Sequence, residues 1–168
     1  MDQQVKKIER VIDEKVKNDR MVELIRTIPS AGLITAATVR AYTDDIRRFS
    51  GYKQYSSYAG LVPWVQNSNR VERVGSITKR GPEELRTALV QIVLGMVRNK
   101  RKTLRYRLML RYDAMKPYKG SGKTIIATAR KLSKIIWYML HNDQPFDPLR
   151  MTDPKLIKLA LEMSVEAA

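Results

Sequence analysis

The 168-residue sequence contains no cysteine and a single histidine, His141. Without cysteine there is no disulfide framework and no thiolate metal site. His141 has no second histidine or cysteine with which to share a metal, so we expect no zinc site. No stretch reaches the ~20 consecutive apolar residues that a transmembrane helix needs. The first four residues lack the basic-then-apolar layout of a signal peptide.

Acidic residues are scarce beside basic ones: 17 Asp and Glu stand against 32 Lys and Arg, for a formal net charge of +15. Such an excess opposes compaction unless a polyanion neutralises it. Nucleic acid is the commonest such partner, and a membrane surface is the alternative, which would need basic residues flanking one continuous apolar helix face. We expect a nucleic-acid-binding protein with no membrane partner, located in the bacterial cytoplasm and associated with the nucleoid.

Helical periodicity dominates the chain and predicts a mainly α fold. A helical arm is expected over residues 2–18, because Val5, Ile8 and Ile12 share one face; it is either a solvated arm or a coiled-coil segment. A helix from Pro82 to about Arg98 starts with acidic residues in its first turn. Other helices are expected after Asp19, over 33–42, over 123–141 and, at the C-terminus, from Asp153.

Two segments break the helical pattern. From Gly60 to Gly81 the signal lapses, which predicts a long central basic loop, and loops of this length are usually functional. A second loop is predicted over residues 116–122. The Gly-Lys-Thr at 122–124 is the end of a P-loop pattern, but Pro117 stands where the full motif needs glycine, so ATP binding is not expected.

Residues 20–42 predict a helix–hairpin–helix unit. Pro29 cannot continue a helix, and Gly32 permits positive φ. In such a unit the hairpin N–H groups and the next helix N-terminus hold a phosphate without reading sequence. Ser30 stands where the first glycine of the pattern is expected. The candidate contacts are Ser30, Gly32 and Thr35, and the alternative is an ordinary helical hairpin in the core.

The central loop combines a hydroxyl with several cations. Ser68 lies between two asparagines, and no histidine lies nearby to act as its base. Cationic groups around a transferring phosphate stabilise its charge, so the residues alone predict a phosphate-contacting loop. Paired carboxylates such as Asp44–Asp45 are explained by helix N-termini, and no metal constellation is apparent. The candidate nucleic-acid-binding residues of this loop and the basic segment after it are Arg70, Arg73, Thr78, Lys79, Arg80, Lys102 and Arg105.

Three ordered sequence blocks are characteristic of a known family. They are Thr27-Ile28-Pro29, the Tyr-Ala-Gly-Leu-Val-Pro of 58–63, and the Ile-Thr-Lys-Arg-Gly of 77–81 followed by Leu85-Arg86. From about residue 20 to residue 140 the chain resembles the C-terminal transposase domain of the IS-one-ten group of insertion-sequence transposases. The Gly-Leu-x-Pro and Ile-Thr-Lys-Arg-Gly blocks together make the resemblance specific.

The resemblance implies a DNA recombinase that works with a structured guide RNA. It pairs this domain with an N-terminal RNase-H-like domain that bears acidic metal ligands. It also implies a serine nucleophile five residues after Pro63, which is Ser68, and a transient 5′-phosphoserine link to DNA. No cofactor is expected on this chain, and Mg²⁺ only with the acidic domain. The expected partners are DNA, the guide RNA and further copies of the chain in a homo-oligomer.

The sequence departs from the family pattern in three ways. The acidic domain is absent, Trp64 stands where arginine is usual, and Asn69 stands where a glycine usually follows the serine. We expect an arm over 1–19 (the remnant of a coiled-coil linker), a transposase C-terminal domain over 20–142 and a helical tail over 143–168. The chain is expected to be a transposase fragment inactive alone; the alternative is a non-catalytic nucleic-acid-binding module, a decayed transposase remnant.

Overall fold

The computed structural model describes residues 2–68, 71–103, 106–147 and 150, with backbone alone for residue 2 and residues 65–74. The expected mainly α fold is confirmed. The helices are α1 Asp2–Val16, α2 Arg20–Arg26, α3 Leu33–Thr43, the 3-10 turn η1 Ile46–Arg48, α4 Tyr52–Tyr58, α5 Glu83–Arg98, α6 Lys100–Thr103 and α7 Arg107–His141. The helix expected from Asp153, with nearly all of the predicted tail, lies outside the described residues. Among the described helices none combines the length and apolar character needed to cross a membrane.

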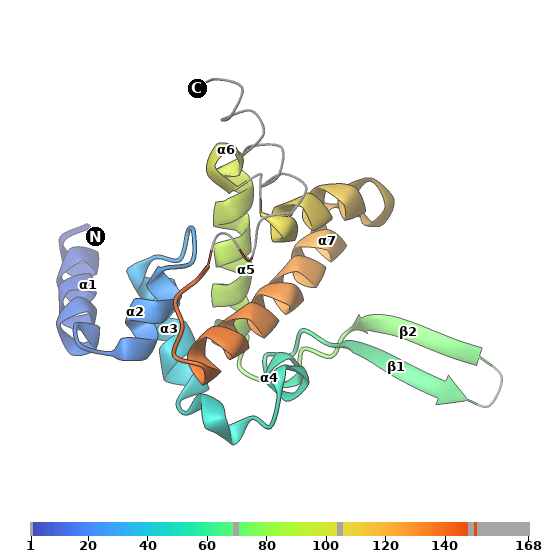
Figure 1. The fold of residues 1–168 in the computed structure, drawn as a ribbon, viewed down its shortest axis with the longest axis horizontal. Helices are drawn as coiled ribbons and strands as arrows, with labels where there is room; N and C mark the ends of the chain where they lie inside the picture. The colour runs from blue at the N-terminus through green and yellow to red at the C-terminus, as the bar shows by residue number, and fades with distance from the viewer. Residues whose placement is uncertain (1, 69–70, 104–105, 148–149, 151–168) are drawn as a thin grey trace, which may run out of the picture.

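The helices α5 and α7 cross at the centre of the body, and α3 and α4 pack against them (Figure 1). On α5 the completely buried Leu85, Leu89 and Ile92 recur every three or four residues, so they form one apolar stripe. Leu132 and Ile136 of α7 are equally buried. Removing these stripes from water holds the two long helices together.

Two buried hydrogen bonds fix α4 within this body. The Ser56 and Ser133 hydroxyls lie 2.7 Å apart and join α4 to α7. The Tyr55 hydroxyl lies 2.8 Å from that of Thr43, which joins α4 to α3. Burial raises the pKa of Tyr55 to about 12. These pairs satisfy polar groups that would otherwise be costly inside the core.

The helix α1 leaves much of its apolar face uncovered. Ile8 is 60% exposed and Val5 49% exposed, whereas Val16 near its C-terminal end packs against the core. The helix predicted over residues 2–18 is therefore present, as an arm on the side of α3 (Figure 1).

Between α4 and α5 the structure differs from the predicted long loop. A two-stranded antiparallel hairpin, β1 Pro63–Ser68 and β2 Val71–Ile77, projects from the helical body (Figure 1). The sequence signal for these strands is weak, because β1 contains one β-branched residue, Val65, and those of β2, Val71, Val74 and Ile77, lie three residues apart rather than two. Pro63 and Gly75 weaken the strand prediction further, because proline and glycine are both unfavourable inside strands.

The loop predicted over residues 116–122 is reduced to a break at one residue, Gly120. The segment α7 consists of two helices that meet at a kink there, where φ is +73° and ψ is +164°. Glycine adopts a positive φ without steric cost, so it permits the change of direction between the two helices of α7. Thr124, one turn later, donates its hydroxyl hydrogen to the Gly120 carbonyl at 2.7 Å.

Candidate nucleic-acid interface

An open groove of about 760 Å³ lies between the root of the hairpin, α4 and α7. Seven basic side chains line it, and its lining residues, all within the described part of the chain, include no carboxylate. A concave surface of one charge sign concentrates its field and attracts a polyanion. The seven cations are Lys53 of α4 and Arg111, Lys119, Lys123, Arg130, Lys131 and Lys134 of α7.

Helical spacing places several of these cations on one face of α7. Lys123, Arg130 and Lys134 follow one another at intervals of seven and four residues, which correspond to two turns and one turn of helix. The apolar residues Leu132 and Ile136 occupy the buried face. The second half of α7 is therefore amphipathic, with a basic stripe along the groove.

The groove cations are not paired with acidic side chains in the described part of the chain. Burial lowers the pKa of Lys131, and repulsion from Lys134 and Arg111 lowers it further. The Lys134 ammonium lies 4.2 Å from the centroid of the Tyr52 ring, a cation–π contact that orients it. A phosphate entering the groove would relieve this repulsion.

The hairpin root is built from two glycines that belong to different sequence blocks. At Gly60, where φ is +67°, a β-carbon would lie 2.8 Å from the Arg80 carbonyl oxygen. At Gly81, where φ is +118°, it would lie 1.9 Å from the Tyr58 carbonyl oxygen. Only glycine fits both the conformations and the contacts. The blocks at 58–63 and 77–81 therefore pack against each other and fix where the hairpin leaves the body.

The candidate residues Thr78, Lys79 and Arg80 lie at this root. Lys79 and Arg80 are exposed but are not among the residues that line the groove. The Thr78 hydroxyl is buried and has no hydrogen-bond partner within the described chain.

Ser68 lies at the other end of the hairpin. Its backbone pairs with Val71, whereas Pro63 at the root pairs with Ile77. At ~3.3 Å per residue, Ser68 is about 17 Å along the strand from Pro63. The structure therefore does not bring Ser68 beside Lys79 and Arg80. The backbone of Arg73 pairs with Gln66 in the same hairpin, and Arg70 lies outside the described residues.

The remaining candidates gather at the opposite end of α5. Ser30 has a positive φ of 68°, and its hydroxyl accepts a hydrogen bond of 3.4 Å from the Asn99 amide. The Asn99 carbonyl accepts from the Lys102 backbone N–H at 3.0 Å. Gly32 is the N-cap of α3, and the Thr35 hydroxyl in the first turn of that helix donates to the Gly32 carbonyl. The length of α5, ~24 Å at 1.5 Å per residue, separates this group from the hairpin root. Arg105 lies outside the described residues.

Sequence reasoning missed the groove, since none of its seven cations was among the candidate residues. The apolar periodicity of 123–141 identified the buried face of the helix, and the same period read for basic residues would have identified Lys123, Arg130 and Lys134. Lys53 gives no such signal, because only the packing of α4 on α7 brings it to the groove.

Metal ligation has little support in this part of the chain. Within the described residues, no three His, Asp or Glu side chains gather where they could hold an ion.

Comparison with known proteins agrees with the sequence blocks at the hairpin root. A model described as the Transposase IS116/IS110/IS902 family matches residues 22–107, just over half of the chain. This places the chain among insertion-sequence transposases. The chain belongs to the IS116/IS110/IS902 transposase family, and the resemblance seen in the sequence is confirmed.

Relatives extend the similarity beyond the matched region. The transposase for insertion sequence element IS1111A of Coxiella burnetii is 30% identical over 146 residues, which cover 86% of this chain and 40% of the relative. A probable family 20 transposase of Pseudomonas aeruginosa is 27% identical over 150 residues, 88% of this chain and 44% of the relative. A pilin gene-inverting protein of Moraxella lacunata is 31% identical over 131 residues, 74% of this chain and 38% of the relative. The chain thus spans less than half the length of these relatives.

Proposed function

We propose that this chain is the strand-holding part of an insertion-sequence transposase, and that the groove binds the sugar–phosphate backbone of DNA. The observation that carries the proposal is the groove lined by seven basic side chains and no carboxylate. Phosphate contacts of this kind position a strand without reading its sequence. A structured guide RNA presents the same phosphates and is the second ligand that we propose for this surface.

Binding can be tested with two variants of equal charge change. The first replaces Lys123, Arg130 and Lys134 of the groove with alanine; the control replaces the exposed Lys6, Lys7 and Arg10 of α1 with alanine. Fluorescence anisotropy with a labelled DNA strand at low salt measures the affinity. We expect the groove variant to bind at least about tenfold more weakly, and the α1 control to stay within about twofold of the unmodified protein. Equal losses of DNA affinity in both variants would reject the proposal that DNA binds in the groove.

For the chemical step we propose Ser68 as the nucleophile, on the strength of the family resemblance. The Ser68 oxygen forms a bond to phosphorus, its proton passes to a base, and the bond from phosphorus to the 3′ oxygen breaks. The 3′ oxygen is protonated as it leaves, and the 5′ end remains as phosphoserine. Attack by another 3′ hydroxyl reverses these changes and completes strand exchange. Because Ser68 is about 17 Å along the strand from the hairpin root, the serine and the groove would engage different phosphates.

The proposed reaction is tested by trapping the covalent adduct. The chain is mixed with labelled element-end DNA and an acidic RNase-H-like domain supplied as a separate polypeptide, since we propose that this chain alone is incomplete. A protein–DNA adduct is expected with the unmodified chain and with the control Ser76→Ala, which removes an exposed hydroxyl from the other strand of the hairpin. It should be lost with Ser68→Ala. An adduct that persists in Ser68→Ala removes Ser68 from the mechanism.

The second candidate is a non-catalytic nucleic-acid-binding module. It is favoured by the separation of Ser68 from Lys79 and Arg80, since a nucleophile needs charge stabilisation close by. Equal DNA affinity of the unmodified chain and Ser68→Ala, with no adduct under any condition, supports this function. For both candidate functions we propose that copies of this chain form a homo-oligomer in which the exposed apolar faces of α1 pack against each other. Sedimentation of the Ile8→Glu variant tests this proposal, since a charge on that face should weaken the association.

A further inference from the structure

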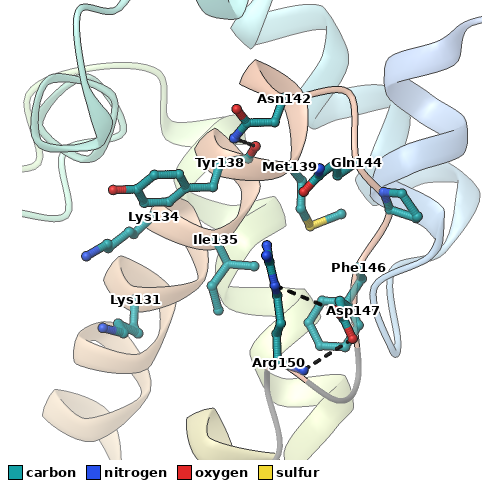
Figure 2. A pocket seen from close by; sticks show the side chains of 11 residues that line it. Lys131, Lys134, Ile135, Tyr138, Met139, Asn142, Gln144, Phe146, Asp147 and Arg150 are labelled. Carbon is teal, nitrogen blue, oxygen red and sulfur yellow. Dashed lines mark hydrogen bonds and ion pairs between the residues drawn. The ribbon is translucent and has the colours of Figure 1, made fainter.

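A second, smaller pocket adjoins the groove at the C-terminal end of α7 (Figure 2). Its volume is about 310 Å³, and Lys131 and Lys134 line both cavities. The buried side chains of Ile135, Met139 and Phe146 contribute to its apolar lining. A ligand of this pocket could thus lie on apolar walls while a negative group attached to it meets the two shared lysines.

The polar residues that line the pocket are suited to a ligand with uncharged hydrogen-bonding groups along one edge. The Gln144 side-chain amide has no hydrogen-bond partner among the residues described, although its backbone N–H donates to the Met139 carbonyl at 2.9 Å. Arg150 is paired with Asp147 at 3.8 Å, so it does not leave an unmatched charge at the pocket (Figure 2). The Phe146 ring is held by an edge-on contact with Tyr106, their centroids 5.5 Å apart. A rigid ring and a free amide together favour a flat ligand with polar edge groups.

We propose that this pocket takes one unpaired nucleobase of the strand whose backbone lies in the groove. A nucleobase has apolar faces, a hydrogen-bonding edge and a phosphate a few bonds away, which match the walls, Gln144 and the pair Lys131 and Lys134. A volume of 310 Å³ lies at the lower end of the range of about 300–1,000 Å³ for small-ligand pockets, consistent with one base. The proposal rests on the proposed binding of a strand in the groove.

The test compares a short single strand of thymidines with an abasic strand of the same length and charge. Fluorescence anisotropy at low salt measures both affinities, with circular dichroism to confirm folding. The unmodified protein should bind the thymidine strand about tenfold more tightly than the abasic strand, as expected when a base finds an aromatic contact. Ile135→Trp fills the pocket and should abolish the preference. Gln3→Trp, which adds the same ring at an exposed polar position of α1, should retain it.

A second, less disruptive substitution provides the test if Ile135→Trp does not fold. Gln144→Ala removes only an exposed side-chain amide and should reduce the preference at least about threefold. A preference that survives in Gln144→Ala and in folded Ile135→Trp overturns the inference, because the base contact then lies elsewhere. Equal binding of thymidine and abasic strands by the unmodified protein also overturns the inference. The proposal that the groove binds the strand backbone then still stands. Failure to bind either strand rejects the proposed function itself.

Discussion

Gly81 packs directly on the backbone of Tyr58, so closely that a β-carbon at position 81 would lie 1.9 Å from the Tyr58 carbonyl oxygen. The contact joins the end of α4 to the segment that leads into α5. It closes the base of the hairpin, where Gly60 makes the reciprocal approach to Arg80. The glycines of the two family blocks are thus explained by one structural joint, which sets the direction of the hairpin and one wall of the groove.

Replacing Gly81 with alanine should therefore destabilise the protein. The new β-carbon meets backbone atoms and φ is +118°, so we expect a loss of at least about 2 kcal/mol in the free energy of unfolding. Urea denaturation followed by circular dichroism measures it. The control is Gly122→Ala, where no atom lies within 4 Å of the β-carbon. This change should leave stability unchanged or raise it by up to about 1 kcal/mol, as in other helices. Equal stability of the two variants would contradict the conclusion that the close packing of Gly81 on Tyr58 requires glycine.

The hydrogen bond between Ser56 and Ser133 should show strong coupling. Either serine replaced alone by alanine leaves a buried hydroxyl with fewer partners, at a cost of about 1–3 kcal/mol. The double variant removes both hydroxyls and should lose clearly less than the sum of the single losses. A double-mutant cycle by urea denaturation measures the coupling. Simple additivity of the two losses would show that the hydroxyls do not interact.

The Tyr55 hydroxyl should make stability sensitive to alkaline pH. Its pKa is about 12 in the folded protein and near 10 when unfolded, so the unfolded chain loses this proton first. The stabilisation is complete below pH 10 and is lost as the pH rises toward 12. Tyr55→Phe should cost about 1–2 kcal/mol at neutral pH, because the buried Thr43 hydroxyl loses its partner.

The difference between the unmodified protein and Tyr55→Phe should then shrink as the pH passes from 10 toward 12. Urea denaturation at several pH values follows it, and groups common to both proteins cancel. Tyr118→Phe is the matched control, since this tyrosine is 89% exposed and its loss should not change stability at any of these pH values. A pH-independent cost of Tyr55→Phe would mean that the ring is not held away from water.

Local sequence patterns predicted the helices well but not how they meet. The start of α5 after Pro82 and its stripe of Leu85, Leu89 and Ile92 follow from spacing alone. The hairpin did not, because its closure depends on the contact between Gly81 and Tyr58, more than twenty residues apart. Short strands have weak intrinsic signals, and such long-range contacts decide them.

For the candidate site, too, the sequence predicted local features but not the contacts between distant segments. The resemblance identified the blocks that form the hairpin root, and the charge of +15 predicted a polyanionic partner. The groove combines Lys53 of α4 with Lys134 of α7, and the packing of α4 against α7, which includes the buried Ser56–Ser133 hydrogen bond, brings the two residues together. Nothing in the spacing of the sequence indicates that packing, so the cations that line the groove could not be selected from the many others.

The salt dependence of DNA binding tests the groove most directly. A plot of log K against log salt concentration falls by about 0.7–0.9 per neutralised phosphate, depending on the form of the strand. Loss of Lys123, Arg130 and Lys134 should make the slope shallower by about 2, whereas loss of Lys6, Lys7 and Arg10 from α1 should leave it unchanged. Identical slopes for the unmodified protein and both variants would contradict the account, because the groove would then hold no backbone.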